Sequence, residues 1–496
     1  MADELREKAI RGAKWRTLAT YTAQGVQLVG AVVLAWLLDK DDYGLMAGAM
    51  VVISLIRGCT SLGMNYAIVQ RRERVEEAVH TGFVLLMGLA AASYAVMLLV
   101  APFTSAYEAD AALVWALGLL FFIRPMGIVT EGAFYRDFRF RRLFVVEVSS
   151  VALSTGLGIG LAAALPPGER YWALAASGLA REALRSGVGW ALAPIRPRLR
   201  FDRDVARELL HYGKYLWAGA VVMVLYNNLE RLALMELLTV GALGLYHFAY
   251  AWVLRVGMIS ETIFGGVAIS VYARVQDDVA RLREGFCRIV GYSTLLSTGL
   301  LTGLVVLVPE AVALAFPPRW MATVPVFRVL GFYYMVRAVD TTTGQLYASV
   351  GKTKYNLYLG LVNTAAMAAT VVPFVLWWGV VGAAWCVLAA RVVTLACNAF
   401  VVRRVLACPL GRLARIVMPA AKAALAMAAV LVAALLGVLH LWGHVGWLAL
   451  GGLVVLGGAS YAAVLYIAER QLFLELLGLL RDALRGKKVK ADGLAS

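Results

Sequence analysis

Apolar runs recur along almost the whole chain, and charged residues gather in the short segments between them. Fourteen of these runs are long enough to cross a bilayer about 30 Å thick. Their approximate limits are 15–38, 43–69, 79–101, 111–135, 143–165, 171–193, 215–238, 241–272, 289–309, 322–350, 356–378, 380–402, 416–439 and 445–468. The pattern predicts an all-α polytopic membrane protein with about 14 transmembrane helices.

Lysine and arginine are distributed very unevenly over the connecting segments. Alternate segments, starting with the N-terminus, hold 34 of the 47 basic residues, whereas the opposite set holds only Lys40, Arg170 and Arg319. Because cytoplasmic loops are enriched in basic residues, the first set is expected to be cytoplasmic. The sequence therefore predicts a multi-pass protein of the inner (cytoplasmic) cell membrane with both termini in the cytoplasm.

Composition narrows the possible function. The 496 residues are 61% hydrophobic and 16% charged, whereas a soluble domain carries about 25% charged residues. The net charge of +16 is scattered over loops rather than collected in a patch, so no nucleic-acid partner is expected. No catalytic or metal-binding motif stands out, and the outer loops are too short to hold an extracytoplasmic enzyme site, so we expect no enzyme, no cofactor and no metal site.

The chain contains an internal repeat. RPMGIVTEGAFYRDFRFRRL (124–143) aligns without a gap with RAVDTTTGQLYASVGKTKYN (337–356), and LLDKDDYGLMAGA (37–49) matches LLTVGALGLYHFA (237–249). Spans 1 to 6 therefore repeat as spans 7 to 12. Because each copy has an even number of spans, the two are expected to be related by an axis along the membrane normal.

The repeat and the charge pattern give five predicted parts of the chain. Two six-helix lobes are expected to surround a central cavity, and two further helices follow them. The parts are an N-terminal lobe (1–193), a cytoplasmic amphipathic linker (194–214), a C-terminal lobe (215–405), spans 13 and 14 (406–468) and a cytoplasmic amphipathic basic tail (469–496). Within the linker, Asp202 or Asp204 is the expected helix N-cap.

Three stretches of the sequence resemble a known family. They are GAKWRTLATYTAQGVQLVGAVVLAWLLDKDDYGLMA at the start, YRDFRFRRL after span 4, and HYGKYLWAGAVVMVLYNNLERLALMELLTVGALGLYHFAYA across spans 7 and 8. The chain is similar to Wzx/WzxC-type oligosaccharide flippases, the polysaccharide-transport branch of the multidrug/oligosaccharidyl-lipid/polysaccharide exporter superfamily. In the family pattern an aspartate stands where this chain has Glu230.

The resemblance implies a function and a set of partners. A flippase of this branch would move a polyprenyl-diphosphate-linked oligosaccharide from the inner to the outer leaflet by alternating access, for synthesis of a surface polysaccharide such as O-antigen, exopolysaccharide or capsule. Membrane lipids, a polysaccharide polymerase and other assembly proteins would be its partners, and H⁺ or Na⁺ its coupling ion. The alternatives are a lipid II flippase and a cation-coupled multidrug antiporter of the same superfamily.

Arginines inside the apolar spans are the candidate substrate ligands. A guanidinium in hydrocarbon costs about 2.5–3.5 kcal/mol on insertion scales, so such a residue is by default a functional candidate. Its planar fork also suits phosphate oxygens. The seven candidates, six of them paired at equivalent or nearly equivalent places in the repeats, are Arg57 with Arg255 (two residues out of frame), Arg124 with Arg337, Arg181 with Arg391, and Arg185.

A second interpretation of the arginines stays open. They can instead be helix-packing residues neutralised within their own lobe, with Glu131 for Arg124 and Asp340 for Arg337. Arg181 and Arg185 are one helical turn apart and repel each other unless something anionic lies between them. Glu131, Glu230 and Asp340 are therefore candidates either for cation coupling or for charge pairing.

Overall fold

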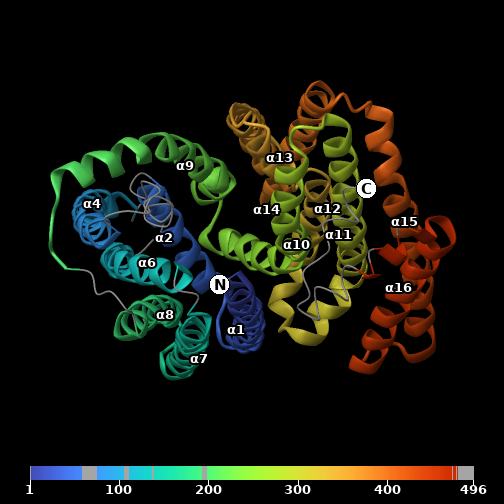
Figure 1. Cartoon of the computed structure of the whole chain (residues 1–496). Helices are drawn as coiled ribbons and strands as arrows, with labels where there is room; N and C mark the ends of the chain where they lie inside the picture. The colour runs from blue at the N-terminus through green and yellow to red at the C-terminus, as the bar shows by residue number, and fades with distance from the viewer. Residues whose placement is uncertain are drawn as a thin grey trace. The chain divides into compact units, whose positions relative to one another are not determined.

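The computed structural model describes residues 2–58, 75–104, 111–136, 139–192, 198–471, 473–475 and 477–478. The described residues form an all-α structure, which confirms the predicted fold class (Figure 1). The chain divides into two compact units, Met1–Gly244 and Leu245–Ser496. The boundaries predicted for the five parts of the chain come from matching residues in the sequence, and they stay predictions.

The first unit contains eight complete described helices and the start of a ninth. They are α1 (Ala2–Leu37), α2 (Lys40–Gly58), α4 (Val75–Thr104), α5 (Ala111–Gly118), α6 (Leu120–Arg136), α7 (Phe140–Ala164), α8 (Tyr171–Leu192), α9 (Arg203–Leu237) and the beginning of α10 (Val240–Val275). Helix α7 packs along both α1 and α8 (Figure 1). Predicted span 4 is divided between α5 and α6.

The second unit contains the rest of α10 and the helices that follow. They are α11 (Val279–Ala315), the 3₁₀ helix η2 (Pro318–Thr323), α12 (Val324–Val339), α13 (Thr343–Ser349), α14 (Lys354–Leu406), α15 (Leu410–Trp442) and α16 (Trp447–Ala468). Helix α14 includes both predicted spans 11 and 12. Its backbone leaves helical geometry between them at Gly379, where φ is 56°, a value that glycine adopts readily.

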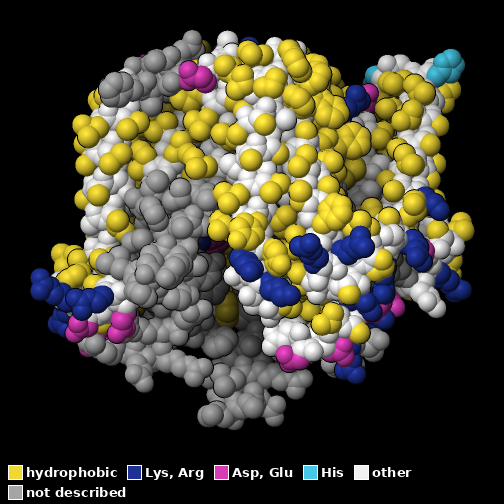
Figure 2. Space-filling view, turned by 90° about the horizontal axis from the view of Figure 1, so that it is seen from above, with side chains coloured by type: hydrophobic (Ala, Val, Ile, Leu, Met, Phe, Trp, Pro, Cys, Tyr) yellow, Lys and Arg dark blue, Asp and Glu magenta, His cyan; other side chains and the backbone are white. Residues whose placement is uncertain are grey.

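Length and hydropathy support membrane crossing. Nine helical stretches among the described residues are long and apolar enough to span a bilayer. On the face seen in Figure 2, hydrophobic side chains cover the helices, and most Lys and Arg side chains gather toward one end of them. The protein is therefore a multi-pass membrane protein, as the apolar runs predict.

The predicted amphipathic linker helix is present, but it is not a separate element. Asp202 is the N-cap, and its carboxylate accepts hydrogen bonds from the backbone N–H groups of Asp204 (2.9 Å) and Val205 (3.0 Å). Val205, Ala206 and Leu209 are buried while the polar positions face out. The helix then continues without a break into span 7 as α9.

Two equivalent glycines bring α2 and the start of α10 into backbone contact within the first unit. A Cβ added at Gly44 would lie 2.0 Å from the carbonyl oxygen of Val240, and one added at Gly244 would lie 1.8 Å from that of Lys40. The repeat alignment pairs Lys40 with Val240 and Gly44 with Gly244. Each contact is therefore the counterpart of the other, and only glycine permits so close an approach.

The tail expected on the membrane surface begins by packing on the second unit. Phe473 contacts the buried cluster of α10, α11 and α14, and Tyr292 of α11 donates a hydrogen bond to Glu475. The basic end of the tail lies outside the described residues.

Candidate functional site

An ion-paired cluster connects three helices of the first unit. Glu147 on α7 lies between two arginines of α8, with its carboxylate oxygens 3.5 Å from Arg181 Nη2 and 3.6 Å from Arg185 Nη2. Arg124 Nε on α6 lies 3.7 Å from a carboxylate oxygen of Glu182 on α8. We call these five residues the N-cluster.

Close helix packing brings these charges together. A Cβ added at Gly158 of α7 would lie 2.9 Å from Ser177 Cβ of α8, and Ser177 Oγ donates a hydrogen bond to the Ser154 carbonyl at 2.9 Å. Ser186 Oγ of α8 donates to the Ile123 carbonyl of α6, also at 2.9 Å. These contacts hold α8 between α6 and α7, so that its charged residues meet partners on both neighbours.

The described ion pairs of the N-cluster are long. Its ion-pair distances of 3.5–3.7 Å exceed the usual N–H···O hydrogen-bond range of about 2.7–3.2 Å. The exposed fractions of its side chains run from 21% to 37%. The described ion pairs of this cluster are therefore longer than strong hydrogen bonds and partly open to solvent.

The second unit holds a tighter, neutral cluster. Arg337 Nη2 on α12 donates to both carboxylate oxygens of Glu261 on α10, at 3.2 and 3.1 Å. Arg391 on α14 donates to Asp340, and these two side chains are only 14% and 5% exposed. We call these four residues the C-cluster. Two arginines and two acids leave no net charge.

A break in predicted span 10 positions the C-cluster. Helix α12 ends at Val339, and α13 begins at Thr343. Hydroxyl and amide groups form hydrogen bonds around the break. Thr343 Oγ1 donates to the Asp340 carbonyl (2.8 Å) and accepts from Asn398 Nδ2 (3.3 Å). The Tyr272 and Thr342 hydroxyls are 3.0 Å apart. This network fixes Asp340 against α14.

The acid partners differ from those that sequence spacing predicts. Arg337 pairs with Glu261 and not with Asp340, because Asp340 lies just beyond the last residue of α12, where the i, i+3 helical geometry ends. Arg124 pairs with Glu182. The side chain of Glu131 lies outside those that the structure describes.

Three further predicted site residues lie outside the two clusters. Arg57 and Arg255 are exposed, and the Arg255 guanidinium lies 5.0 Å from the centroid of the Trp252 ring. Glu230 on α9 is buried, with its carboxylate 3.7 Å from Arg231 Nε. Among the described residues, no group of three or more His, Cys, Asp or Glu side chains could hold a metal ion. The ligand roles of all seven arginines stay predictions.

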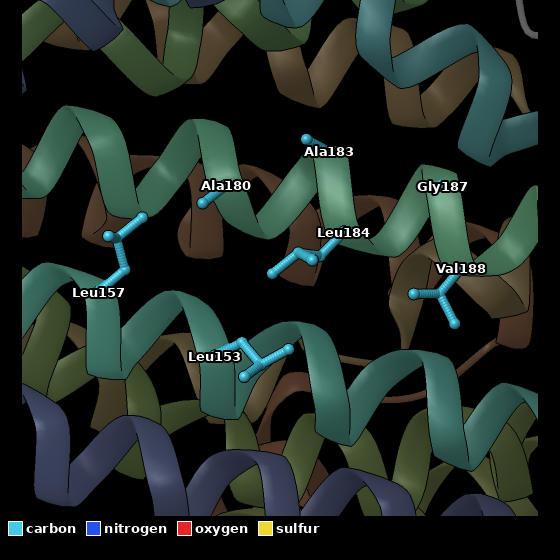
Figure 3. A pocket seen from close by; sticks show the side chains of 7 residues that line it. All are labelled: Leu153, Leu157, Ala180, Ala183, Leu184, Gly187 and Val188. Carbon is cyan, nitrogen blue, oxygen red and sulfur yellow. The ribbon is translucent and has the colours of Figure 1, made fainter.

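An apolar groove lies between α7 and α8, and none of its lining residues belongs to the N-cluster. Its volume is about 640 Å³. In Figure 3, Leu184 and Val188 of α8 point toward α7, which contributes the facing Leu153 and Leu157. Ala180, Ala183 and Gly187 complete the lining. Because Leu153 and Leu157 are 59% and 44% exposed, the groove is open along its α7 side.

Comparisons with known proteins agree with this architecture. The chain is 27% identical to the lipopolysaccharide biosynthesis protein WzxC of Escherichia coli (strain K12), over 69% of this chain and 70% of WzxC. It is 22% identical to the teichuronic acid biosynthesis protein TuaB of Bacillus subtilis (strain 168), over 71% and 74%. The fold matches the inward closed conformation of the lipid II flippase MurJ with a TM-score of 0.72, at 11% identity, over 92% of this chain and 99% of that one.

A family model covers more than half of the chain. It matches residues 33–325, which include the whole N-cluster, the apolar groove and the paired glycines of α2 and α10. With the relatives and the shared fold, this match confirms the resemblance drawn from spans 1, 4, 7 and 8. The chain belongs to the polysaccharide biosynthesis protein family, in the Wzx/WzxC-type branch of the multidrug/oligosaccharidyl-lipid/polysaccharide exporter superfamily.

Proposed function

We propose that the protein is a flippase that moves a polyprenyl-diphosphate-linked oligosaccharide from the inner to the outer leaflet of the cytoplasmic membrane. The transported head group would serve synthesis of a cell-surface polysaccharide, with both termini of the transporter in the cytoplasm. A polysaccharide polymerase would use the product on the outer side. The observation that carries the proposal is the gathering of three arginines, Arg124, Arg181 and Arg185, inside the apolar spans of a protein of this family.

The N-cluster suits the diphosphate of such a substrate. Arg181 and Arg185 lie one turn apart on α8 and share one carboxylate, that of Glu147. A diphosphate offers several oxygens to the same two guanidinium groups, and bidentate arginine–phosphate pairs are among the stronger polar contacts. We therefore assign head-group binding to Arg181 and Arg185, together with the nearby Arg124. The head group is released when Arg181 and Arg185 pair with Glu147 again.

The C-cluster has a different role in this proposal. Arg337 and Arg391 already have hydrogen-bonded acid partners, and Asp340 is almost wholly buried. Pulling Arg391 away would leave the Asp340 carboxylate unpaired in a low-dielectric interior, which is strongly unfavourable. Pulling Arg337 away would break its hydrogen bonds to both carboxylate oxygens of Glu261. We therefore assign these two arginines to stabilising the second unit. Arg57 and Arg255 remain candidate ligands because they are exposed.

Two alternative substrates follow from the same superfamily. A lipid II flippase would use the same cationic chemistry, and the fold likeness to MurJ favours this candidate. A cation-coupled multidrug antiporter would instead use an acidic site, for which the buried carboxylate of Glu230 is the candidate. Coupling to H⁺ or Na⁺ is compatible with either substrate.

The test is transport of fluorescent polyprenyl-diphosphate oligosaccharides in proteoliposomes. Replacing Arg181 or Arg185 with glutamine removes charged hydrogen bonds to the substrate, each worth about 1.5–3 kcal/mol, or roughly 10-fold to 150-fold in affinity. Lysine should restore part of the activity, since it keeps the charge without the fork. Arg203→Gln, on the exposed face of α9, is the matched control and should transport normally.

Two outcomes would contradict the proposal. Normal transport by both glutamine variants would remove the N-cluster from substrate binding. Preferential transport of lipid II over other prenyl-diphosphate oligosaccharides would favour the lipid II flippase. Preferential transport of cationic drugs would favour the multidrug antiporter. Folded yield is measured for every variant, so that loss of transport is separated from loss of protein.

A further inference from the structure

We propose that the exposed face of α15 binds an anionic phospholipid of the inner leaflet through Arg415 and Lys422. This lipid is a ligand that stays in its leaflet, so the inference rests on the proposed membrane orientation and not on the transported substrate. It is carried by two exposed basic side chains on one face of an apolar helix, neither of which has an acidic partner among the described side chains.

The two basic residues share one face of α15, turned away from the rest of the second unit. The buried residues of this helix, spaced three or four apart, are Ala420, Ala423, Met427 and Leu431. That spacing places them on one side of the helix. Arg415 and Lys422 are both exposed, and their separation of seven residues brings their side chains within about 20° of each other around the axis. One ligand can therefore contact both.

The helices around this face supply no negative charge to it. Neither α15 nor α16 contains an aspartate or a glutamate. On α11, Glu284 pairs with Arg412 and with Arg288, and the pair with Arg412 joins α15 to α11. An ionised side chain inside a membrane span is costly unless something compensates it. A phosphate of the surrounding bilayer can supply the negative charge that Lys422 lacks within the described residues.

Depth in the membrane brings both cations to the phosphate level of one leaflet. With the proposed orientation, α15 begins at its cytoplasmic end with Leu410. At 1.5 Å per residue, Arg415 lies about 8 Å and Lys422 about 18 Å along the axis from that end. The apolar span begins near residue 416, so Arg415 lies at the membrane surface and Lys422 about 9 Å deeper. The flexible four-carbon stem of a lysine lets its ammonium extend back toward the surface.

The same face of α15 becomes wholly apolar toward the bilayer centre. Leu425, Val432 and Leu436 are 73%, 46% and 61% exposed. All three lie within about 100° of Arg415 around the helix axis. A phospholipid with its phosphate on the two cations can therefore lay an acyl chain along these side chains. Charge near the surface and hydrocarbon below it is the order of parts in a lipid of the inner leaflet.

Charge favours an anionic phospholipid over the other occupants of such a face. A zwitterionic lipid carries its own ammonium group, whereas each lysine or arginine near an anionic lipid surface strengthens binding by about fivefold. A second copy of this chain fits less well. A two-fold axis along the membrane normal would place equivalent residues at the same depth, so Lys422 would meet like charges. We therefore commit to an anionic phospholipid.

The experiment uses the full-length protein in phosphatidylcholine liposomes that contain a small fraction of phosphatidylglycerol with a diazirine at the start of one acyl chain. Mass spectrometry of the photo-crosslinked protein should locate the label on α15, between Arg415 and Leu425. Unlabelled phosphatidylglycerol should remove this label, and added phosphatidylcholine should not. Equal competition by the two lipids would mean contact with bulk lipid only and would overturn the inference, as would an unlabelled α15.

Matched variants test the two cations. Lys422→Gln and Arg415→Gln should each lower labelling of α15 by about fivefold. Lys422→Arg keeps the charge and should label normally. Arg207→Gln makes the same charge change at an exposed position of α9 and controls for general attraction to anionic lipid, so it should leave labelling of α15 unchanged. Because all four positions are on the surface or retain charge, folded yield is measured as a check. Unchanged labelling of the folded Lys422→Gln protein would overturn the proposed site.

Discussion

The buried ion pair between Asp340 and Arg391 gives the sharpest test of how the two clusters differ. Replacing Arg391 with methionine, or Asp340 with leucine, leaves one buried charge without its partner. Such a change typically costs about 3–5 kcal/mol, whereas removing both members of a buried pair is often neutral or stabilising. The double variant should therefore recover most of the stability that either single variant loses.

The magnitude follows from the burial of the two side chains. Asp340 and Arg391 are 5% and 14% exposed, so solvent screens the lost pair little. A domain of 150–250 residues loses roughly 2–4 °C in Tm for each kcal/mol, so the single variants should unfold about 6–20 °C lower. Hydrogen bonds between membrane helices average only about 0.6 kcal/mol in double-mutant cycles, so a shift of this size would identify an unpaired charge.

Buried cysteines supply the readout. Cys287, Cys386 and Cys408 are buried and free in the second unit, and a thiol-reactive fluorophore reports their exposure during heating in detergent. Arg181→Gln is the comparison variant and should shift the Tm much less, because the N-cluster is partly exposed and its ion pairs are long. If Arg391→Met kept its Tm but lost transport, Arg391 would be a substrate ligand, and the structural role assigned to the C-cluster would be wrong.

Three further predictions concern packing, release and driving force. Gly244→Val should abolish the yield of folded protein on size-exclusion chromatography, because its Cβ would lie 1.8 Å from the Lys40 carbonyl oxygen. The control Gly88→Val has open space around its Cβ and should keep a normal yield. Glu147→Gln should tighten prenyl diphosphate binding and slow transport, because it removes the carboxylate that both Arg181 and Arg185 contact. Faster transport by this variant would contradict the prediction. An inside-negative potential of 100 mV, set with valinomycin and potassium, should speed export, since two negative charges gain about 5 kcal/mol; a rate independent of potential would mean that a coupled ion compensates the charge.

Periodicity and length predicted most of the fold. A lipid-facing helix must satisfy its backbone internally, so each apolar run long enough to cross the bilayer gives a helix with few alternatives. The sequence did not predict that linker and span 7 form one helix, because the polar stretch around Lys214 resembles a helix end. Nor did it predict the break after Val339, where hydroxyl and amide groups from other helices satisfy the freed backbone.

The charge pairs show where sequence reasoning stops. The repeat places arginines at equivalent or nearly equivalent positions in its two copies, and the need to compensate them predicts nearby acids. Which acid meets which arginine depends on contacts between helices, and those follow from small residues such as Gly158 and Ser177 that spacing along one helix does not reveal. Glu147 satisfies the requirement for an anion between Arg181 and Arg185, yet it comes from the preceding helix.

The equivalent arginines of the repeat have acquired unequal surroundings, and this inequality has a physical consequence. In the second unit each arginine has its own hydrogen-bonded carboxylate, and the Asp340–Arg391 pair is also screened from water, so any anion would compete with contacts that are already made. In the first unit one carboxylate serves both Arg181 and Arg185 at distances too long for strong hydrogen bonds. We therefore propose that an anionic head group binds to the first unit, while the second unit keeps its pairs. On this proposal, two equally tight clusters would lack the looser pairs from which a diphosphate can displace Glu147 and by which it can later be displaced.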